Sequence, residues 1–137
     1  MNLEECINFL LTGAQHRVFQ EMKNELKVYD LTPIQYGVLK CIWEKDLSNP
    51  KEIAVQLGIE NSTISGVLER MEAKGFIVRE IDPDDRRYIK LILSDKAREL
   101  EEAVNQTVLE VNQKVLKGYT KEETALFKSF LKRMIEI

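Results

Sequence analysis

The sequence predicts a mainly helical fold that carries one small β-hairpin, an α+β arrangement within a single domain. Three observations lead to this fold class. Apolar residues recur every three or four positions over most of the chain, which is the period of an amphipathic helix. Residues 76–93 instead hold two runs rich in β-branched side chains on either side of a turn-forming segment. Residues that begin and end helices separate the periodic segments.

The chain of 137 residues is 44% hydrophobic and 31% charged, which is typical of one globular domain. No apolar run approaches the roughly 20 residues that span a bilayer, so we expect no membrane partner. The first residues, Met1 to Cys6, are acidic where a secretory signal would be basic, and a cytoplasmic location is therefore expected.

The sequence has no nucleophile motif, phosphate-binding loop or cluster with metal-ligand spacing, and its one histidine, His16, has no obvious partner. We therefore expect no enzyme activity, no metal and no cofactor. Cys6 and Cys41 lie far apart, which favours two buried thiols over a disulfide framework.

Two helices open the chain. The first is predicted from Leu3 to about Lys27, with a wide apolar surface. The second begins after Thr32, whose hydroxyl and the Gln35 side chain form the pattern of a capping box around Pro33. This second helix continues to Trp43.

A pair of short helices follows. Asn49 precedes a helix over residues 51–57, Gly58 has the role of a left-handed helix cap, and Asn61 is predicted to cap the next helix. A three-residue turn between two short helices is typical of a helix-turn-helix motif, although an unrelated helical hairpin could share the pattern.

The second helix of this motif has an unusual outer face. Ile64, Val67, Leu68 and Met71 form an ordinary buried stripe. The opposite face carries small polar side chains and a glycine that weakens the helix: Asn61, Ser62, Thr63, Ser65 and Gly66. Such a face suits close approach to another surface, of which a DNA major groove is one candidate, while a merely solvated face is the alternative.

Residues 76–81 and 88–93 are predicted to form a β-hairpin directly after this motif, in the position of a wing. The turn between them holds Arg86 and Arg87, a local source of positive charge in a chain whose net charge is −3. Asp85 is expected to brace one of these arginines through a bidentate ion pair. An arginine at a wing tip can enter a DNA minor groove; a self-neutralised surface loop is the alternative.

The last two helices are predicted over residues 95–117, capped by Ser94 and ended by Gly118, and over residues 121–135, preceded by a capping box of Thr120 and Glu123. We divide the single domain of residues 1–137 into a winged helix-turn-helix lobe, residues 32–93, and a helical dimerisation region, residues 1–30 and 95–137. The apolar helices outside the lobe must be buried on each other or on a second copy, and a two-fold dimer is expected.

With these elements in order, the chain resembles the multiple-antibiotic-resistance-regulator (MarR) family of winged-helix transcription factors. Three segments carry the resemblance. They are Leu31 to Leu39, Ser62 to Arg79 with its Ser62-Thr63-Ile64-Ser65 start, and Asp82 to Ser94 with its Asp82 to Arg87 turn. The resemblance implies a homodimer that binds pseudo-palindromic double-stranded operator DNA. Such a dimer is usually a repressor that a small molecule, often aromatic or phenolic, or an oxidation event releases.

By the family's pattern, the groove-facing helix presents Ser62, Thr63, Ser65 and Arg70, and the wing tip is Asp85-Arg86-Arg87. Gly66 departs from the pattern, because many members carry a basic residue there. Tyr36, Trp43 and His16 lie on elements that could line an effector crevice, and are equally plausible as core residues.

Two alternative functions remain open from the sequence. Cys6 near the start of the first helix is similar in place to the reactive cysteine of the peroxide-sensing branch of the family, although the surrounding residues do not match closely. A thiol-based sensor of the same fold is therefore one alternative. A winged-helix module that binds only proteins is the other.

Overall fold

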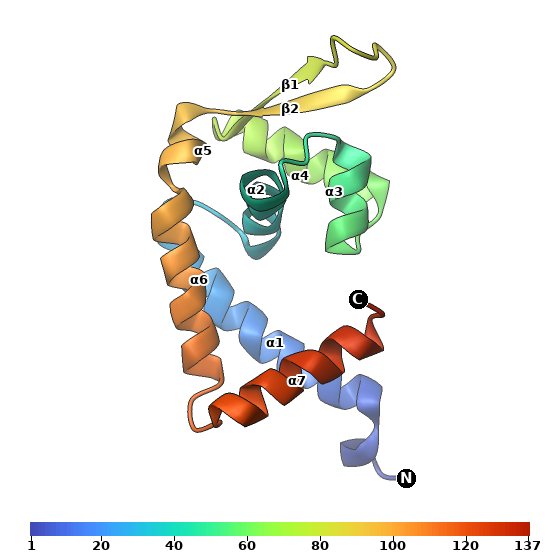
Figure 1. The fold of residues 1–137 in the computed structure, drawn as a ribbon, viewed down its shortest axis with the longest axis vertical. Helices are drawn as coiled ribbons and strands as arrows, with labels where there is room; N and C mark the ends of the chain where they lie inside the picture. The colour runs from blue at the N-terminus through green and yellow to red at the C-terminus, as the bar shows by residue number, and fades with distance from the viewer.

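The computed structural model describes residues 1–137 and places a compact winged lobe at one end of a long helical region (Figure 1). In chain order the elements are the 3₁₀ turn η1 (Leu3–Glu5), α1 (Ile7–Leu26), the 3₁₀ turn η2 (Lys27–Tyr29), α2 (Pro33–Lys45), α3 (Pro50–Leu57), α4 (Asn61–Ala73), β1 (Ile77–Ile81), β2 (Ile89–Leu93), α5 (Asp95–Glu99), α6 (Glu101–Val115) and α7 (Lys121–Met134). This mainly helical architecture with a single hairpin confirms the predicted fold class.

The first helix begins at Ile7, so the predicted start near Leu3 was wrong. Asn2 and Glu5 cap each other instead: the Glu5 N–H donates to the Asn2 side chain at 3.1 Å, and the Asn2 N–H donates to the Glu5 carboxylate at 2.9 Å. This closes a 3₁₀ turn, after which Cys6 has an extended backbone (φ −74°, ψ 116°). An extended residue interrupts helical hydrogen bonding, and α1 starts after it.

The lobe starts with the predicted capping box, in which Thr32 accepts the Gln35 N–H and Gln35 accepts the Thr32 N–H. Gly58 ends α3 in the left-handed conformation (φ 66°), which a residue with a side chain rarely adopts. The prediction that Asn61 caps α4 was wrong. Glu60 takes the cap position without a side-chain hydrogen bond, because its backbone is the last extended one before the helix, and Asn61 is already helical.

The hairpin is antiparallel, with Ile77 opposite Leu93 and Ile81 opposite Ile89. Its base is anchored, since Ile77 and Leu91 are buried and the Leu91 N–H donates to the Ser48 carbonyl at 2.8 Å. The rest of β1 is exposed, and the hairpin extends beyond the helices of the lobe (Figure 1). The strands therefore act as a wing and contribute only their inner ends to the core.

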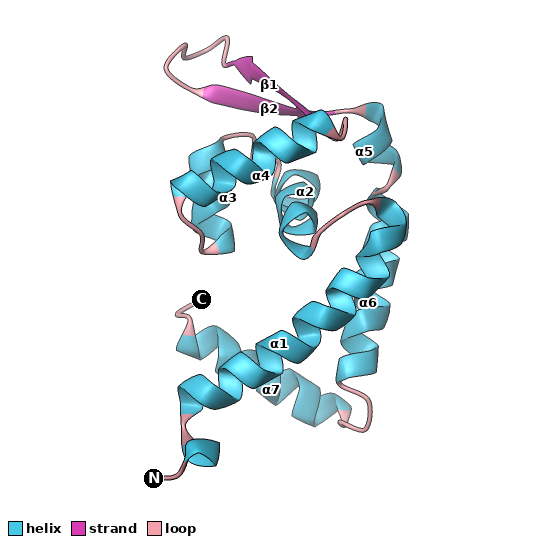
Figure 2. Cartoon of the chain, turned by 180° about the vertical axis from the view of Figure 1, so that it is seen from behind, coloured by secondary structure: helices cyan, strands magenta, loops and turns pink.

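The helix predicted over residues 95–117 is divided at Leu100 into α5 and α6. The two parts pack on different neighbours. Lys96 of α5 lies over the Phe76 ring, 4.4 Å from its centre, and its ammonium donates to the Lys74 carbonyl at 2.9 Å. α6 instead runs beside α1, where Lys114 pairs with Glu21 at 2.8 Å (Figure 2). The bend lets one segment join the lobe to the helical region.

Buried residues concentrate in the lobe and where it meets α1, α5 and the start of α6. The largest fully buried side chains include Leu26, Leu39, Ile53, Leu68, Met71 and Phe76. α7 has no buried residue, although its predicted broad apolar face is present. None of the helices has the length and apolarity needed to cross a membrane.

Candidate nucleic-acid interface

The outer face of α4 is short, polar and exposed. Ile64, Val67, Leu68 and Met71 are buried on the inner side, so the helix is held firmly on the lobe. Ser62, Thr63 and Ser65 face outward, and the Ser65 hydroxyl donates back to the Asn61 carbonyl at 3.1 Å. The side chains that project from the first turns of this helix are short and polar.

A concavity of about 280 Å³ lies between the start of α3, α4 and the wing. Its lining comes from three separate segments: Asn49, Pro50, Lys51, Asn61, Ile64, Ser65, Leu68, Arg79, Arg87, Tyr88 and Ile89. This set contains three cationic side chains and no carboxylate, although the whole chain has a net charge of −3. The fold therefore gathers cationic side chains at one place, where they can approach phosphate, and two of them, Arg79 and Arg87, are paired with carboxylates that lie outside the concavity.

The wing tip holds Arg87 in a fixed position. Its Nε and Nη2 atoms donate to the two carboxylate oxygens of Asp85 at 3.0 and 2.8 Å, and its N–H also donates to Asp85. These hydrogen bonds lower the pKa of Asp85 and raise that of Arg87. Asp85 braces the Arg87 guanidinium, and because the Arg87 side chain is 81% exposed, the guanidinium is still available to a ligand. Arg86 makes no hydrogen bond or ion pair.

A second ion pair joins α4 to the hairpin. Glu72 accepts the Arg79 N–H at 3.0 Å and the Arg79 guanidinium at 3.1 Å, and the backbone hydrogen bond followed by the side-chain one lowers the pKa of Glu72. The pair neutralises an acidic residue beside the outer face of α4. It also ties the base of the wing to α4, so the two surfaces keep one relative position.

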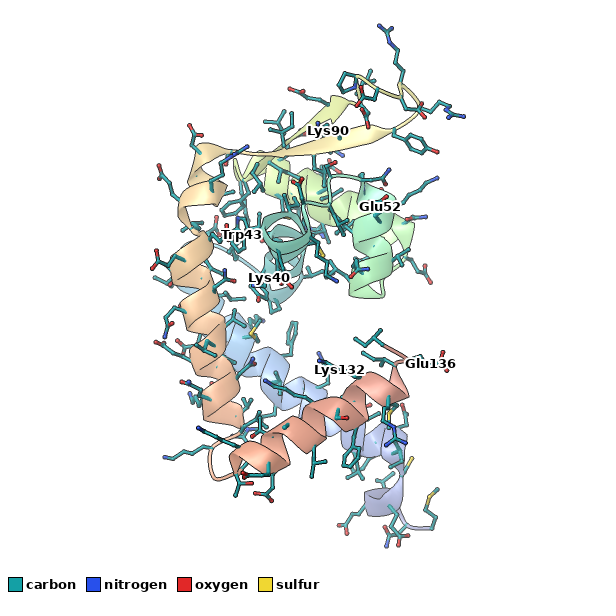
Figure 3. The ribbon with its side chains drawn as sticks, in the orientation of Figure 1. Lys40, Trp43, Glu52, Lys90, Lys132 and Glu136 are labelled. Carbon is teal, nitrogen blue, oxygen red and sulfur yellow. The ribbon has the colours of Figure 1, made fainter.

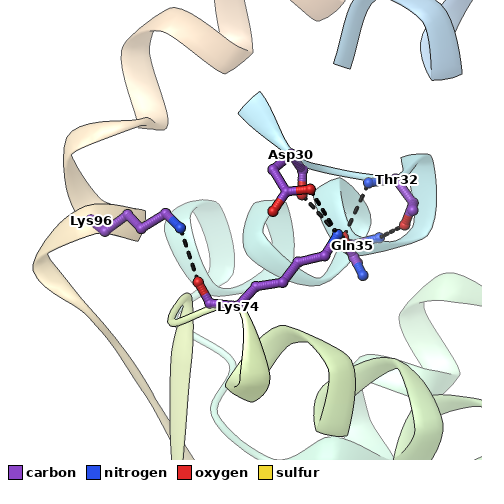
Figure 4. Close-up of polar contacts among 5 residues, drawn as sticks. All are labelled: Asp30, Thr32, Gln35, Lys74 and Lys96. Atoms are coloured by element: carbon purple, nitrogen blue, oxygen red, sulfur yellow. Dashed lines mark hydrogen bonds and ion pairs between the residues drawn. The ribbon is translucent and has the colours of Figure 1, made fainter. Parts of the chain in front are cut away.

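The far end of α4 is fastened to the start of α2 (Figure 4). The Lys74 ammonium donates to the Asp30 carbonyl at 2.9 Å and to the Gln35 side chain at 3.1 Å, and lies 3.4 Å from the Asp30 carboxylate. Gln35 is the one buried polar residue of the chain, and Lys74 together with Thr32 satisfies its carbonyl oxygen. Lys74 is thus a structural residue that fixes the direction of α4.

Arg70 lies along the outer face of α4. A Cβ atom added at Gly66 would meet the Nη1 and Nη2 atoms of Arg70 at 3.4 and 3.6 Å, so the guanidinium folds back over the glycine. Arg70 has no hydrogen bond or ion pair with any other side chain. Its charge is the uncommitted one on this face, unlike those of Arg79 and Arg87.

The predicted binding residues are only partly brought together. Asn61, Ser65 and Arg87 line the same concavity, whereas Gly66 and Arg70 contact each other farther along α4. Arg86 stands apart at the wing tip. Sequence reasoning did not single out Lys51, Arg79 or Tyr88 as site residues. The position of Lys51 directly after the helix-opening Asn49-Pro50 was the available signal, because it places a cation at a helix start.

The residues considered for redox or effector roles lie elsewhere. Cys41 is buried, and burial raises the pKa of its thiol, whereas Cys6 is only partly buried, so the prediction of two buried thiols holds for one of them. Burial also raises the pKa of Tyr36. His16 is exposed on α1.

Trp43 lies at the side of the lobe (Figure 3), where it lines a cavity of about 500 Å³ with Leu91 and Arg98. The Trp43 indole N–H is buried without a partner. No cluster of three or more metal-binding side chains occurs in the chain.

Comparison with known proteins places this geometry in a family. The model of the MarR family matches residues 31–89. The HTH-type transcriptional regulator MgrA of Staphylococcus aureus is 35% identical over 97 residues, which cover 70% of this chain and 66% of MgrA. The aligned segment thus spans slightly less than two thirds of that relative's length.

Two solved structures share the fold over nearly the whole chain. The transcriptional repressor CouR, bound to a 23-mer DNA duplex, superposes with a TM-score of 0.86 at 28% identity, over 97% of this chain and 94% of CouR. BpsR of Bordetella bronchiseptica, whose DNA binding is regulated by 6-hydroxynicotinic acid, has a TM-score of 0.91 at 23% identity, over 100% and 98% of the two chains. Sequence match, helix order and hairpin agree, and the chain belongs to the MarR family of winged-helix transcriptional regulators.

Proposed function

We propose that this protein is a homodimeric, sequence-specific DNA-binding repressor that a small-molecule effector releases from its operator. α4 would enter the major groove, and the wing would follow the adjacent minor groove. The residues that we assign to DNA contact are Asn61, Ser62, Thr63, Ser65, Gly66, Arg70, Arg86 and Arg87, with Asp85 as the brace of the wing. The lobe, residues 32–93, is the DNA-binding part.

One observation carries the proposal: a protein of net charge −3 collects Lys51, Arg79 and Arg87 around a concavity free of carboxylates, beside an exposed helix face of small polar residues. Phosphate contacts need local cations, and base contacts need donors and acceptors that can approach closely. The two requirements are met on adjacent surfaces. A protein partner would not require cations on one surface and short hydrogen-bonding side chains on the surface beside it.

The dimer follows from the helical region. Phe127 and Phe130 of α7 are 40% and 54% exposed, and Phe9 and Leu10 of α1 are 45% and 48% exposed. An apolar surface of this extent is costly in water, and a second copy with the same surface would cover it. We assign residues 1–30 and 95–137 to the helical dimerisation region, in which the exposed apolar side chains of α1 and α7 would form the interface. The two-fold axis would place two copies of α4 in successive major grooves.

The effector site is proposed at the junction of the lobe with the helical region. The Lys40 ammonium of α2 donates to Asn105 of α6 at 3.1 Å across it, and beside it the hydroxyls of Tyr29 and Thr107 lie 2.8 Å apart. A small aromatic or phenolic ligand wedged there would change the angle between α2 and α6, and with it the spacing of the two α4 helices. The likeness to BpsR is one of fold, so its ligand does not specify the effector here.

A fluorescence anisotropy titration with the DNA upstream of the protein's own gene tests the function. We expect salt-dependent binding as a dimer, release by at least one compound in a thermal-shift panel of phenolic acids, and no effect of the same compounds on free DNA. Binding that is independent of salt, or no preference over scrambled DNA, would refute the assignment. Unchanged release in a Cys6→Ser variant separates ligand control from thiol control.

A further inference from the structure

We infer that Gly66 is a positioning residue for Arg70, and that the Arg70 guanidinium, lying over Gly66, reads a guanine in each operator half-site. The inference rests on the proposed function and assigns the base reading within it. Gly66 itself makes no contact by a side chain. Its contribution is the space above it, which Arg70 occupies.

The helical period puts the residues of this inference in one row. Ser62, Gly66 and Arg70 are spaced by four, so they lie above one another on the same face of α4. Side chains of a helix point toward its N-terminus, and a long one covers the turn before its own Cα. Arg70 therefore extends back toward Ser62 along the middle of the exposed face.

The distances define what residue 66 can be. A Cβ atom there would lie 3.4 Å from Nη1, 3.6 Å from Nη2 and 3.9 Å from Cζ of Arg70. These are ordinary contact distances, so alanine would fit beneath the guanidinium. A longer side chain that extends from Cβ toward the guanidinium would enter its volume and would force Arg70 to another rotamer.

The charge of Arg70 is free for a ligand. Arg79 is paired with Glu72 and Arg87 with Asp85, while the Arg70 guanidinium has no hydrogen bond or ion pair. A guanidinium that lies along a helix in the major groove can present two N–H donors, and guanine is the base whose O6 and N7 atoms accept both. Lysine could supply the charge at position 70 but not this paired geometry.

A double-variant cycle tests the inference on a duplex that the wild-type protein selects from a pool of random 30-base-pair DNA. The variants are Arg70→Ala, Gly66→Ala, Gly66→Met and Gly66→Met with Arg70→Ala. We expect Arg70→Ala and Gly66→Met each to weaken binding to the selected duplex by roughly tenfold or more, and Gly66→Ala, whose Cβ atom would fit beneath the guanidinium, to weaken it less than Gly66→Met does. Because Gly66→Met acts through Arg70, it should have no further effect in the Arg70→Ala background.

Two controls accompany the cycle. Arg98→Ala removes an exposed arginine of α5 whose side chain has no hydrogen bond or ion pair, and should leave the selected affinity within about twofold. Replacement of the selected guanine by 7-deazaguanine, which lacks the N7 acceptor, should weaken the wild type and Gly66→Ala but not Arg70→Ala. Circular dichroism and sedimentation of every variant show whether the fold and the dimer are retained.

The outcomes separate the inference from the proposed function. If the pool yields no enriched sequence, DNA reading fails and the inference falls with it. If a sequence is enriched but Gly66→Met is neutral, or weakens binding equally in the Arg70→Ala background, the inference alone is overturned, since residue 66 would then be irrelevant or would contact DNA directly. The inference is also overturned if no guanine of the selected site weakens wild-type binding when it is replaced by 7-deazaguanine.

Discussion

The lobe and α7 contain similar apolar residues but differ in what a single chain does with them. Phe76 in the lobe is completely buried, between the end of α4 and Lys96 of α5, whereas Phe130 in α7 is 54% exposed. Six lobe and junction helices share one core, while α7 has no buried residue at all. A single copy therefore completes the core of the lobe, and in the proposed dimer a second copy would cover the apolar surface of α7.

The largest expected effect comes from making the α7 surface polar. Phe130→Glu should convert the dimer to a monomer, because a carboxylate cannot be buried in an apolar interface without a partner. Loss of the second reading helix should then weaken operator binding roughly 100-fold. Sedimentation velocity measures the first effect and anisotropy the second. Val55→Glu, at a 77% exposed position of α3, is the control for sedimentation and should remain a dimer. A dimeric Phe130→Glu would contradict the assigned interface.

The next effect contrasts the two kinds of phenylalanine. Phe76→Ala should lower the free energy of unfolding by about 3–5 kcal/mol, because it leaves a cavity in the lobe core. This loss should not depend on protein concentration. Phe127→Ala in α7 should instead lower stability by an amount that grows as the protein is diluted, since it weakens association. Chemical denaturation at two concentrations distinguishes them. If the loss of stability depended on protein concentration in the same way for both variants, the distinction between the two regions would be wrong.

A smaller effect is expected within the lobe. Arg87→Ala should weaken binding to selected and random DNA alike and reduce the slope of log affinity against log salt by about 2, because the dimer loses one phosphate contact from each of its two wings. Ser62→Ala and Thr63→Ala should change sequence preference while leaving that slope unchanged. Arg133→Ala, on α7, is the matched control for charge. An unchanged slope in Arg87→Ala would show that the wing does not touch phosphate.

The smallest effect concerns the brace of the wing. The pKa of Asp85 is lowered in the folded protein by hydrogen bonds from Arg87, so the ion pair is present above the pKa of an unfolded aspartate and is lost as pH falls through the lowered folded value. An NMR titration of the carboxyl carbons should show the lowered midpoint. Arg87→Ala should return the pKa of Asp85 toward its ordinary value. An Asp85 midpoint that Arg87→Ala does not move would show that the pair is absent in solution.

Local sequence signals predicted most of the fold. The capping boxes at Thr32 and Thr120, the left-handed Gly58 and the turn between the two strands each depend on residues within a few positions of one another, and all four are present. The errors are also local in origin. The 3₁₀ turn before Ile7 and the cap at Glu60 depend on backbone conformations that neighbouring residue types leave open.

The candidate site was predictable only in part. The polar face of α4 and the Arg87 brace follow from spacing along the chain. The involvement of Lys51 and Arg79 does not, because α3 and β1 approach the same concavity only when the lobe is folded. The bend at Leu100 likewise reflects two different packing partners rather than a helix-breaking residue.

The sequence by itself determined the order of helices and hairpin, the buried stripe of α4 and the family to which the chain belongs, because helical period, caps and turns are short-range properties. Tertiary structure alone decided where the charges gather and what they are free to do. It brought Lys51 and Arg79 to the concavity beside α4, and it paired Arg79 with Glu72. Ion pairs and open space depend on distances across the fold, and these exist only after the helices have packed.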